Sequence, residues 1–189
     1  MYKVAIILCG AGGGNMILLG LGSNLTTERY KTSCDVLEAS LKALLENHIE
    51  VERLSSWYRS APVPSSDQPW FVNAVATLRT DLTPPDLLAA LHEVEAEFGR
   101  VRSVRNASRT LDLDLLAYDN VVVDEPGGLV LPHPRLAERA FVLLPLAEVA
   151  PRWRHPVSGL TAAEMLAELP ADQAVERLGE ANGGAGSRS

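Results

Sequence analysis

Residues 105–116 read RNASRTLDLDLL, and from Thr110 onward polar and apolar residues alternate with a period of two. On a β-strand this period places Asp112 and Asp114 on one face and the neighbouring leucines on the other. Side chains two positions apart on a strand lie about 7 Å from one another along the backbone, and converging carboxylates can share two divalent ions about 4 Å apart. The stretch therefore predicts a strand that carries a pair of metal-binding aspartates.

Four arginines lie just upstream of this strand: Arg100, Arg102, Arg105 and Arg109. Guanidinium groups neutralise the non-bridging oxygens of a polyphosphate, while metal ions polarise the phosphorus under attack. An isolated Asp-x-Asp pair can instead be the solvated face of an amphipathic strand. Because Asp is a poor strand former and two like charges on one face repel, the pair together with the arginines favours a site for metal and phosphate.

Composition limits the classes of protein that fit this chain. Its 189 residues, 47% of them hydrophobic, are enough for one well-packed domain. The net charge of -7 argues against a nucleic-acid partner, which requires a broad basic surface. Two cysteines are too few for a disulfide framework or a metal cluster, so we expect a cytoplasmic protein. No apolar run approaches the roughly 20 residues of a membrane span, so no membrane partner is expected.

The two ends of the chain differ from its middle. The stretch Ala5–Gly10 (AIILCG) is loosely echoed by Asn15–Gly20 (NMILLG). Because the second copy contains a methionine, one hypothesis is that Met16 is the natural start and that residues 1–15 are an extension. Residues 179–189 have nothing to bury, and we expect them to form a disordered tail.

The hydrophobic patterns and turn residues of residues 16–170 predict alternating strands and helices in a single domain. The predicted elements are a strand over 17–21, a helix capped by Thr26 or Thr27, strands over 49–58 and 70–78, a helix from Thr83 to Gly99, and the Asp-x-Asp strand. This β-α-β-β-α-β order is that of the ferredoxin-like α+β fold, an antiparallel sheet with its helices on one face. In a C-terminal extension we expect a helix from Leu136 to Ala147 that Pro145 disturbs, and another opened by the capping box Thr161–Glu164.

A long irregular segment, residues 59–69, separates the second and third predicted strands. Its prolines fix an extended path. A loop of this length inside a compact domain is often functional, although a plain linker is the alternative.

Several motifs of the chain occur together in one known family. They are GLGSNL (20–25), WYRS (57–60), DQPWFVNA (67–74), GRVR (99–102), RTLDLD (109–114), LPH (131–133) and RAF (139–141). In this order, over roughly residues 16–170, the chain resembles the 6-hydroxymethyl-7,8-dihydropterin pyrophosphokinase family of folate biosynthesis. The resemblance implies an enzyme that transfers the pyrophosphoryl unit of ATP, its co-substrate, to the hydroxymethyl oxygen of a reduced pterin and releases AMP. It also implies two Mg²⁺ ions as cofactors.

The resemblance further implies roles for individual residues. Asp112 and Asp114 match the magnesium ligands, and Arg100 and Arg109 match catalytic arginines on the phosphates. The other matches to the nucleotide site are Glu95, Arg102, Leu115, His133 and Arg139. The matches to the pterin site are Ser60 and Val63 through the main chain, Phe71 and Phe141 as the rings that sandwich the pterin, and Asn73. The amide of Asn73 carries donors and an acceptor together, which suits the amino-pyrimidinone edge of a pterin.

Other interpretations of these residues stay open. Taken as isolated residues, Phe71 and Phe141 would more often be part of a core, and a single histidine between prolines, such as His133, would more often be structural. A non-catalytic ferredoxin-like module that binds a small ligand is one alternative function. Another phosphoryl or nucleotidyl transferase, which would form ADP or pyrophosphate instead of AMP, is a second. We expect small-molecule partners only and a monomer.

The chain departs from the family pattern at two places. Asn106, Ala107 and Ser108 stand where members commonly have Trp-Gly-Pro, which bears on how this loop closes over ATP. Phe71 stands where some members have Tyr, so a hydroxyl is lost and a stacking face is kept.

Overall fold

The computed structural model describes residues 16–63, 67–99, 108–125 and 128–179 of the chain. The hypotheses about an N-terminal extension and about the tail beyond Gly179 lie outside these residues, as do Arg100, Arg102 and Arg105.

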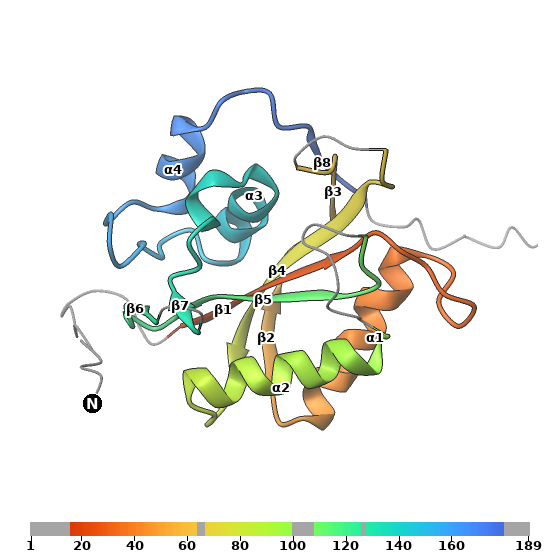
Figure 1. Ribbon diagram of the computed structural model, residues 1–189. Coiled ribbons are helices and arrows are strands. Elements are labelled where there is room, and N and C mark those ends of the chain that lie inside the picture. Colours follow the sequence, from red (N-terminus) through yellow and green to blue (C-terminus); the bar gives the residue numbers. More distant parts are fainter. Residues whose placement is uncertain (1–15, 64–66, 100–107, 126–127, 180–189) are drawn as a thin grey trace, which may run out of the picture.

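An antiparallel sheet forms the centre of the described structure (Figure 1). Its strands are β1 (Ile17–Ser23), β2 (Glu50–Leu54), β3 (Tyr58–Ser60), β4 (Phe71–Arg79), β5 (Asp112–Tyr118) and β8 (Val175–Arg177). They lie in the order β5-β1-β4-β3-β8, and β2 also pairs with β4. Every pairing in this sheet is antiparallel. A separate ribbon consists of β6 (Val123–Asp124) and β7 (Val130–Leu131). The predicted α+β class with an antiparallel sheet is therefore confirmed.

Two helices, α1 (Ser33–Glu46) and α2 (Pro84–Glu97), cover one face of the sheet (Figure 1). Their buried leucines, including Leu37 and Leu91, share one core with Leu113 of β5. Helix α2 begins after Thr83, whose hydroxyl caps it, and Gly99 with a φ of +78° follows its C-cap, as the sequence predicted. The alternation of buried leucines and partly exposed aspartates in β5 is also as predicted.

Helix α1 starts later than predicted. The sequence placed its cap at Thr26 or Thr27, but the N-cap is Thr32. The hydroxyl of Thr32 accepts a hydrogen bond from the backbone N–H of Asp35 (3.1 Å), and the carboxylate of Asp35 accepts one from the N–H of Thr32 (2.8 Å). This reciprocal capping box satisfies two helix-end donors at once, which a lone threonine cannot do.

A second layer of helices covers the opposite face of the sheet (Figure 1). It consists of the 3-10 helix η1 (Leu136–Glu138), α3 (Ala140–Val149) and α4 (Ala162–Glu168). Leu143 and Leu146 of α3 pack there against Leu18 and Leu116, which point away from the first core. The two helices of the βαββαβ unit thus share one face, as predicted, and the helices of the C-terminal extension cover the other. Strand β1 is apolar on both faces and needs a cover on each. No described helix has the length and apolar character to cross a membrane.

The predicted strand over residues 49–58 is two strands, β2 and β3. Ser55, which is buried, lies directly after β2 in the segment between the two strands. Its hydroxyl accepts a hydrogen bond from the N–H of Val75 in β4 (3.0 Å). A side chain thus satisfies the β4 backbone, and the chain can bend there before β3 begins.

The C-terminal part differs from the prediction in two ways. Pro145 does not end its helix, because α3 continues to Val149 and the break lies instead at Arg139, between η1 and α3. Proline removes one backbone hydrogen bond, and the burial of the surrounding leucines offsets that loss. The sheet also gains a strand beyond residue 170, because β8 pairs with β3.

Candidate active site

A cavity of about 160 Å³ opens on the α3 side of the sheet. It lies where β1, β4 and β5 meet the segment after β3 and the start of α3. The predicted site residues that line it are Ser60, Val63, Phe71, Asn73, Arg109, Asp112, Asp114, Arg139 and Phe141. The structure therefore gathers the predicted pterin residues, both aspartates and two of the predicted arginines around one space.

Two glycines of β1 keep this space open beside the aspartates. In the strand register Gly22 lies opposite Asp112 and Gly20 lies opposite Asp114. A Cβ atom on Gly22 would lie 3.4 Å from the amide oxygen of Asn73 and 3.8 Å from the Cβ of Asp112. Gly20 and Gly22 thus contribute no side chains to the floor between the amide and the carboxylates.

Each aspartate has an arginine beside it. Nη1 of Arg109 lies 2.5 Å from Oδ2 of Asp112, and Nη1 of Arg139 lies 3.6 Å from Oδ2 of Asp114. Burial raises the pKa of Asp114 above its ordinary value, and the negative charge of Asp112 raises it further, while nearby cationic groups oppose the shift. The pair is therefore stabilised by cations placed close to it.

Backbone contacts fix the position of Arg109. Its N–H donates to the amide oxygen of Asn24 (2.7 Å), and its carbonyl accepts from the N–H groups of Asn24 and Leu25. The amide oxygen of Gln68 accepts hydrogen bonds from the amide of Asn24 (3.3 Å) and the hydroxyl of Ser108 (3.0 Å). This network joins the loop after β1, the loop before β4 and the segment that carries Arg109.

The amide and aromatic residues lie on two elements that face each other across the cavity. Asn73 of β4 is buried, and its Nδ2 donates a hydrogen bond to the hydroxyl of Ser60 in β3 (2.9 Å). Phe71 of β4 and Phe141 of α3 both line the cavity and are only partly buried. The guanidinium of Arg139 lies 5.3 Å from the centre of the Phe141 ring. Two accessible rings and a fixed amide form a slot suited to a flat polar heterocycle.

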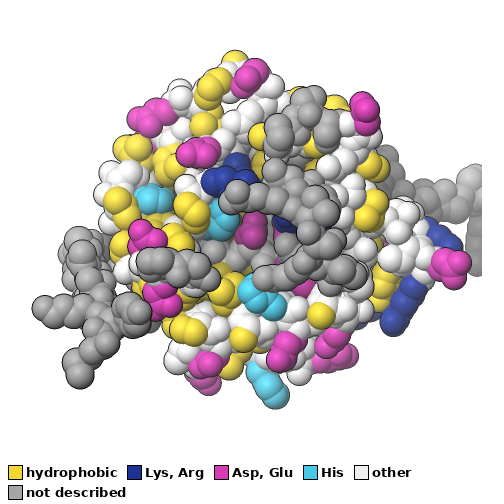
Figure 2. All heavy atoms as spheres, in the orientation of Figure 1, with side chains coloured by type: hydrophobic (Ala, Val, Ile, Leu, Met, Phe, Trp, Pro, Cys, Tyr) yellow, Lys and Arg dark blue, Asp and Glu magenta, His cyan; other side chains and the backbone are white. Residues whose placement is uncertain are grey.

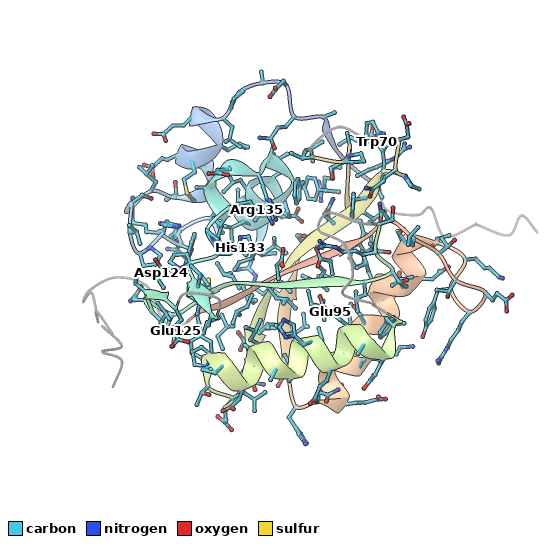
Figure 3. All side chains as sticks on the ribbon, in the orientation of Figure 1. Trp70, Glu95, Asp124, Glu125, His133 and Arg135 are labelled. Carbon is cyan, nitrogen blue, oxygen red and sulfur yellow. The ribbon has the colours of Figure 1, made fainter. Side chains whose placement is uncertain are left out.

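A second cavity, of about 250 Å³, adjoins the first at Asp114. The predicted nucleotide residues Glu95, Leu115 and His133 line it, together with His92, to which the sequence assigned no role. Figure 3 shows Glu95 on α2 and His133 on the segment between β7 and α3, on either side of β5. Asp114 thus borders both spaces.

Glu95 and His133 also contact the backbone of β5. An oxygen of the buried Glu95 accepts a hydrogen bond from the N–H of Leu113 (2.8 Å), and the N–H of His133 donates to the carbonyl of Leu116 (2.8 Å). These contacts hold the strand that carries the aspartates. Burial lowers the pKa of His133, which favours its neutral ring, and Nδ1 of that ring accepts the N–H of Arg135 (3.2 Å). The ring proton of neutral His133 therefore lies on Nε2.

Basic, acidic and histidine side chains gather near the middle of the face shown in Figure 2. No group of three or more His, Cys, Asp or Glu side chains in the described part of the chain is arranged to hold a metal ion. Magnesium does not require such a group, because it is commonly held by one or two carboxylates with water and substrate phosphates. The oxygen donors of Asp112 and Asp114, at the junction of the two cavities, fit that requirement.

Fold and site together define a class of protein. Paired carboxylates, arginines and an amide-and-aromatic slot on an α+β scaffold are the features of an enzyme that transfers a phosphate-containing group to a small cyclic acceptor. The family model of 7,8-dihydro-6-hydroxymethylpterin-pyrophosphokinase (HPPK) matches residues 18–151. The chain belongs to this family.

Named relatives agree with the family. The chain is 42% identical over 163 residues to the 2-amino-4-hydroxy-6-hydroxymethyldihydropteridine pyrophosphokinase of Pseudomonas aeruginosa, with 86% of this chain and 96% of that protein covered. It is 41% identical over 152 residues to the enzyme of the same name from Synechocystis sp., with 80% and 75% covered. A crystal structure of HPPK-DHPS in complex with substrates has a similar fold, with a TM-score of 0.57, 12% identity, and 81% of this chain and 44% of that chain covered.

Proposed function

We propose that this chain transfers the pyrophosphoryl group of ATP to the hydroxymethyl group of 6-hydroxymethyl-7,8-dihydropterin and releases AMP, as a step of folate biosynthesis. Membership of the pyrophosphokinase family supports the reaction. The observation that carries the assignment of the site is the shared cavity, in which Asp112 and Asp114 lie beside Asn73 and two phenylalanine rings. A polar heterocycle bound at the amide would present its substituent to the carboxylates.

The pterin would occupy the slot between Phe71 and Phe141, with Asn73 on its hydrogen-bonding edge. The bond from Asn73 to Ser60 fixes the amide before the ligand arrives, so less orientational freedom is lost on binding. The partly exposed rings offer stacking faces on both sides. Ser60 and Val63 line the same space and would complete the slot through their main chain.

The phosphates of ATP would lie between the two cavities, with the nucleoside against Glu95, Leu115 and His133. Arg109 and Arg139 would neutralise phosphate oxygens as charge develops during transfer, and the Asn24 contacts hold Arg109 in place beforehand. Arg100 and Arg102 stay predictions of the same kind. Two Mg²⁺ ions held by Asp112 and Asp114 would supply charge neutralisation and polarisation of the transferred group when bound.

An assay with ATP, Mg²⁺ and 6-hydroxymethyl-7,8-dihydropterin tests this function. We expect pterin-dependent AMP, and a loss of at least about a hundredfold in rate for Asp112→Asn and for Asp114→Asn. Asp124→Asn, which changes an exposed acid on β6, is the matched control and should keep the wild-type rate. Formation of ADP, or of AMP without pterin, would contradict the proposal.

Three accompanying expectations concern the protein as a whole. We propose that the chain acts as a monomer in the cytoplasm and has small-molecule partners only. Sedimentation of the purified protein at assay concentration would test the first point, and a dimer would contradict it.

A further inference from the structure

Arg135 lines the cavity of the two aspartates, and the motifs assign it no role. It lies on the segment between β7 and α3, directly before η1, where Figure 3 shows it next to His133. Its N–H donates to Nδ1 of His133, which ties this part of the backbone to the histidine ring.

The position of Arg135 relates it to both cavities. Arg135 lines the first cavity, while the two residues before it, His133 and Pro134, line the second. Asp114 borders both spaces as well. Arg135 therefore stands at the junction, beside the place where a ligand would pass from one cavity into the other.

Among the described residues that line the first cavity, arginines outnumber acids by one. These charged residues are Arg109, Arg135, Arg139, Asp112 and Asp114. Each aspartate has one of the other two arginines beside it. The guanidinium of Arg135 forms no salt bridge with any carboxylate in residues 16–63, 67–99, 108–125 or 128–179, and the remaining segments of the sequence contain a single acid, Glu180.

The charge of Arg135 acts on its neighbours. Burial lowers the pKa of Arg139, and the nearby charge of Arg135 lowers it further. The same charge also contributes to the low pKa of His133, after burial and Arg139. The guanidinium groups of Arg109, Arg135 and Arg139 line one cavity and repel one another, and a polyanion bound between them would turn that repulsion into attraction.

We propose that Arg135 binds the phosphate chain of ATP at the junction of the two cavities, as a further arginine beside Arg109 and Arg139. The inference rests on the proposed function and adds a residue to it. Arg135 contacts the phosphates and neither the nucleoside nor the pterin, because it lies between the spaces assigned to those two groups. Its planar, forked guanidinium can hold two phosphate oxygens at once.

The test compares Arg135→Gln with wild type by calorimetric titration of a non-hydrolysable ATP analogue with Mg²⁺, and of adenosine. We expect the variant to bind the analogue about tenfold to a hundredfold more weakly and adenosine unchanged. Its pterin KM should stay at the wild-type value. The affinity of Arg135→Lys for the analogue should lie between those of wild type and Arg135→Gln, because an ammonium keeps the charge and loses the forked geometry. Arg152→Gln, an exposed arginine that lines neither cavity, is the matched control and should bind as wild type does.

Two outcomes would overturn the inference. If Arg135→Gln and wild type bound the analogue with equal affinity, Arg135 would be an ordinary solvated arginine. Pterin-dependent AMP from wild type would still support the proposed function in that case. An equal loss for adenosine would show a general disturbance of the nucleotide cavity. A wild-type protein that bound no ATP analogue would overturn the inference and the proposed function together.

Discussion

Gly22 shows how a single missing side chain shapes the site. It lies between the amide oxygen of Asn73 and the Cβ of Asp112, and a Cβ on residue 22 would make ordinary contacts of 3.4 and 3.8 Å with these atoms. A methyl group would therefore fit the fold. It would, however, occupy space at the floor of the cavity where the acceptor and the carboxylates meet. Stability and function are expected to respond to this residue in different directions.

Gly22→Ala is predicted to fold with unchanged or slightly higher stability and to lose activity. Replacing a strand glycine reduces the freedom of the unfolded chain, which is worth about 0.5 kcal/mol. The pterin KM should rise by about tenfold, because a methyl group displaces the ligand from its best position. Urea denaturation and steady-state kinetics measure the two effects. Gly179→Ala, at a position with no atoms within 4 Å of the added Cβ, is the control.

Asn73→Ala is predicted to weaken pterin binding by about a hundredfold and to leave binding of an ATP analogue unchanged. The reason is that a site built around a buried amide leaves polar groups of the ligand unpaired when the amide is removed. Titration with each ligand separately measures the difference. Asn47→Ala removes an amide at the end of α1 that donates a 2.9 Å hydrogen bond to the carbonyl of Ala43, and it should leave both affinities unchanged. Equal losses for both ligands in Asn73→Ala would contradict the assignment.

Among the elements, helix α3 is tied to the region of β3 by hydrogen bonds of Glu148. Glu148 accepts hydrogen bonds from the N–H and hydroxyl of Ser56 and from the hydroxyl of Tyr58, at 2.9 to 3.0 Å, and Arg177 of β8 lies 3.7 Å away. Burial alone would raise the pKa of Glu148, but these donors and Arg177 lower it below its ordinary value. The cluster therefore ties α3, which carries Phe141, to β3, which carries Ser60.

Glu148→Gln is predicted to lower the free energy of unfolding by about 1 kcal/mol at pH 7, after allowance for partial solvent exposure. Because the pKa of Glu148 is lower in the folded protein than in the unfolded chain, its contribution is present above the ordinary pKa of glutamate. It is lost as the pH falls through the folded value. Denaturation curves of the two proteins should therefore differ at pH 7 and converge in acid. A constant difference at all pH values would contradict this account.

Local patterns predicted the elements whose signals are complete within a few residues. The threonine and prolines at the start of α2, the capping box of α4 and the alternation of β5 are of this kind. The predicted start of α1 was wrong because the sequence offers three threonines as possible N-caps. Of these, only Thr32 has an acid three residues later. The second helix layer and β8 depend on contacts between distant segments, which a local pattern does not contain.

The candidate site was predictable as a set of residue types and only partly as an arrangement. Asp112 and Asp114 share one face because of a two-residue period, as expected. Asn24, Gln68 and Arg135 received no role, although the first two lie in motifs, since their importance comes from hydrogen bonds or charges across the chain. The two-cavity arrangement around Asp114 likewise follows from packing and has no local signal.

On the scale of the whole molecule, the C-terminal segment closes the structure. The amide of Gln173 accepts the N–H of Ala140 at the start of α3 (2.8 Å) and donates to the carbonyl of Glu138 (2.9 Å). A few residues later β8 pairs with β3 next to Ser60. The chain beyond residue 170 therefore supports both sides of the first cavity.

Truncation after Pro170 is predicted to lower the free energy of unfolding by more than about 2 kcal/mol, since it removes β8 and the Gln173 contacts. The KM for pterin should rise as well, because Ser60 and Phe141 lose support. Truncation after Gly179 keeps all of these contacts and is the control. Thermal denaturation and kinetics of the two shortened chains measure the effect, and equal behaviour would contradict it.

The position of β5 at the end of the strand order has a consequence for the behaviour of the protein in solution. An edge strand with free N–H and carbonyl groups is a template on which a strand of another molecule can add. Here Glu95 and His133 use the N–H of Leu113 and the carbonyl of Leu116. Two residues that line the second cavity thereby also block intermolecular strand addition, and loss of either contact would expose the protein to aggregation.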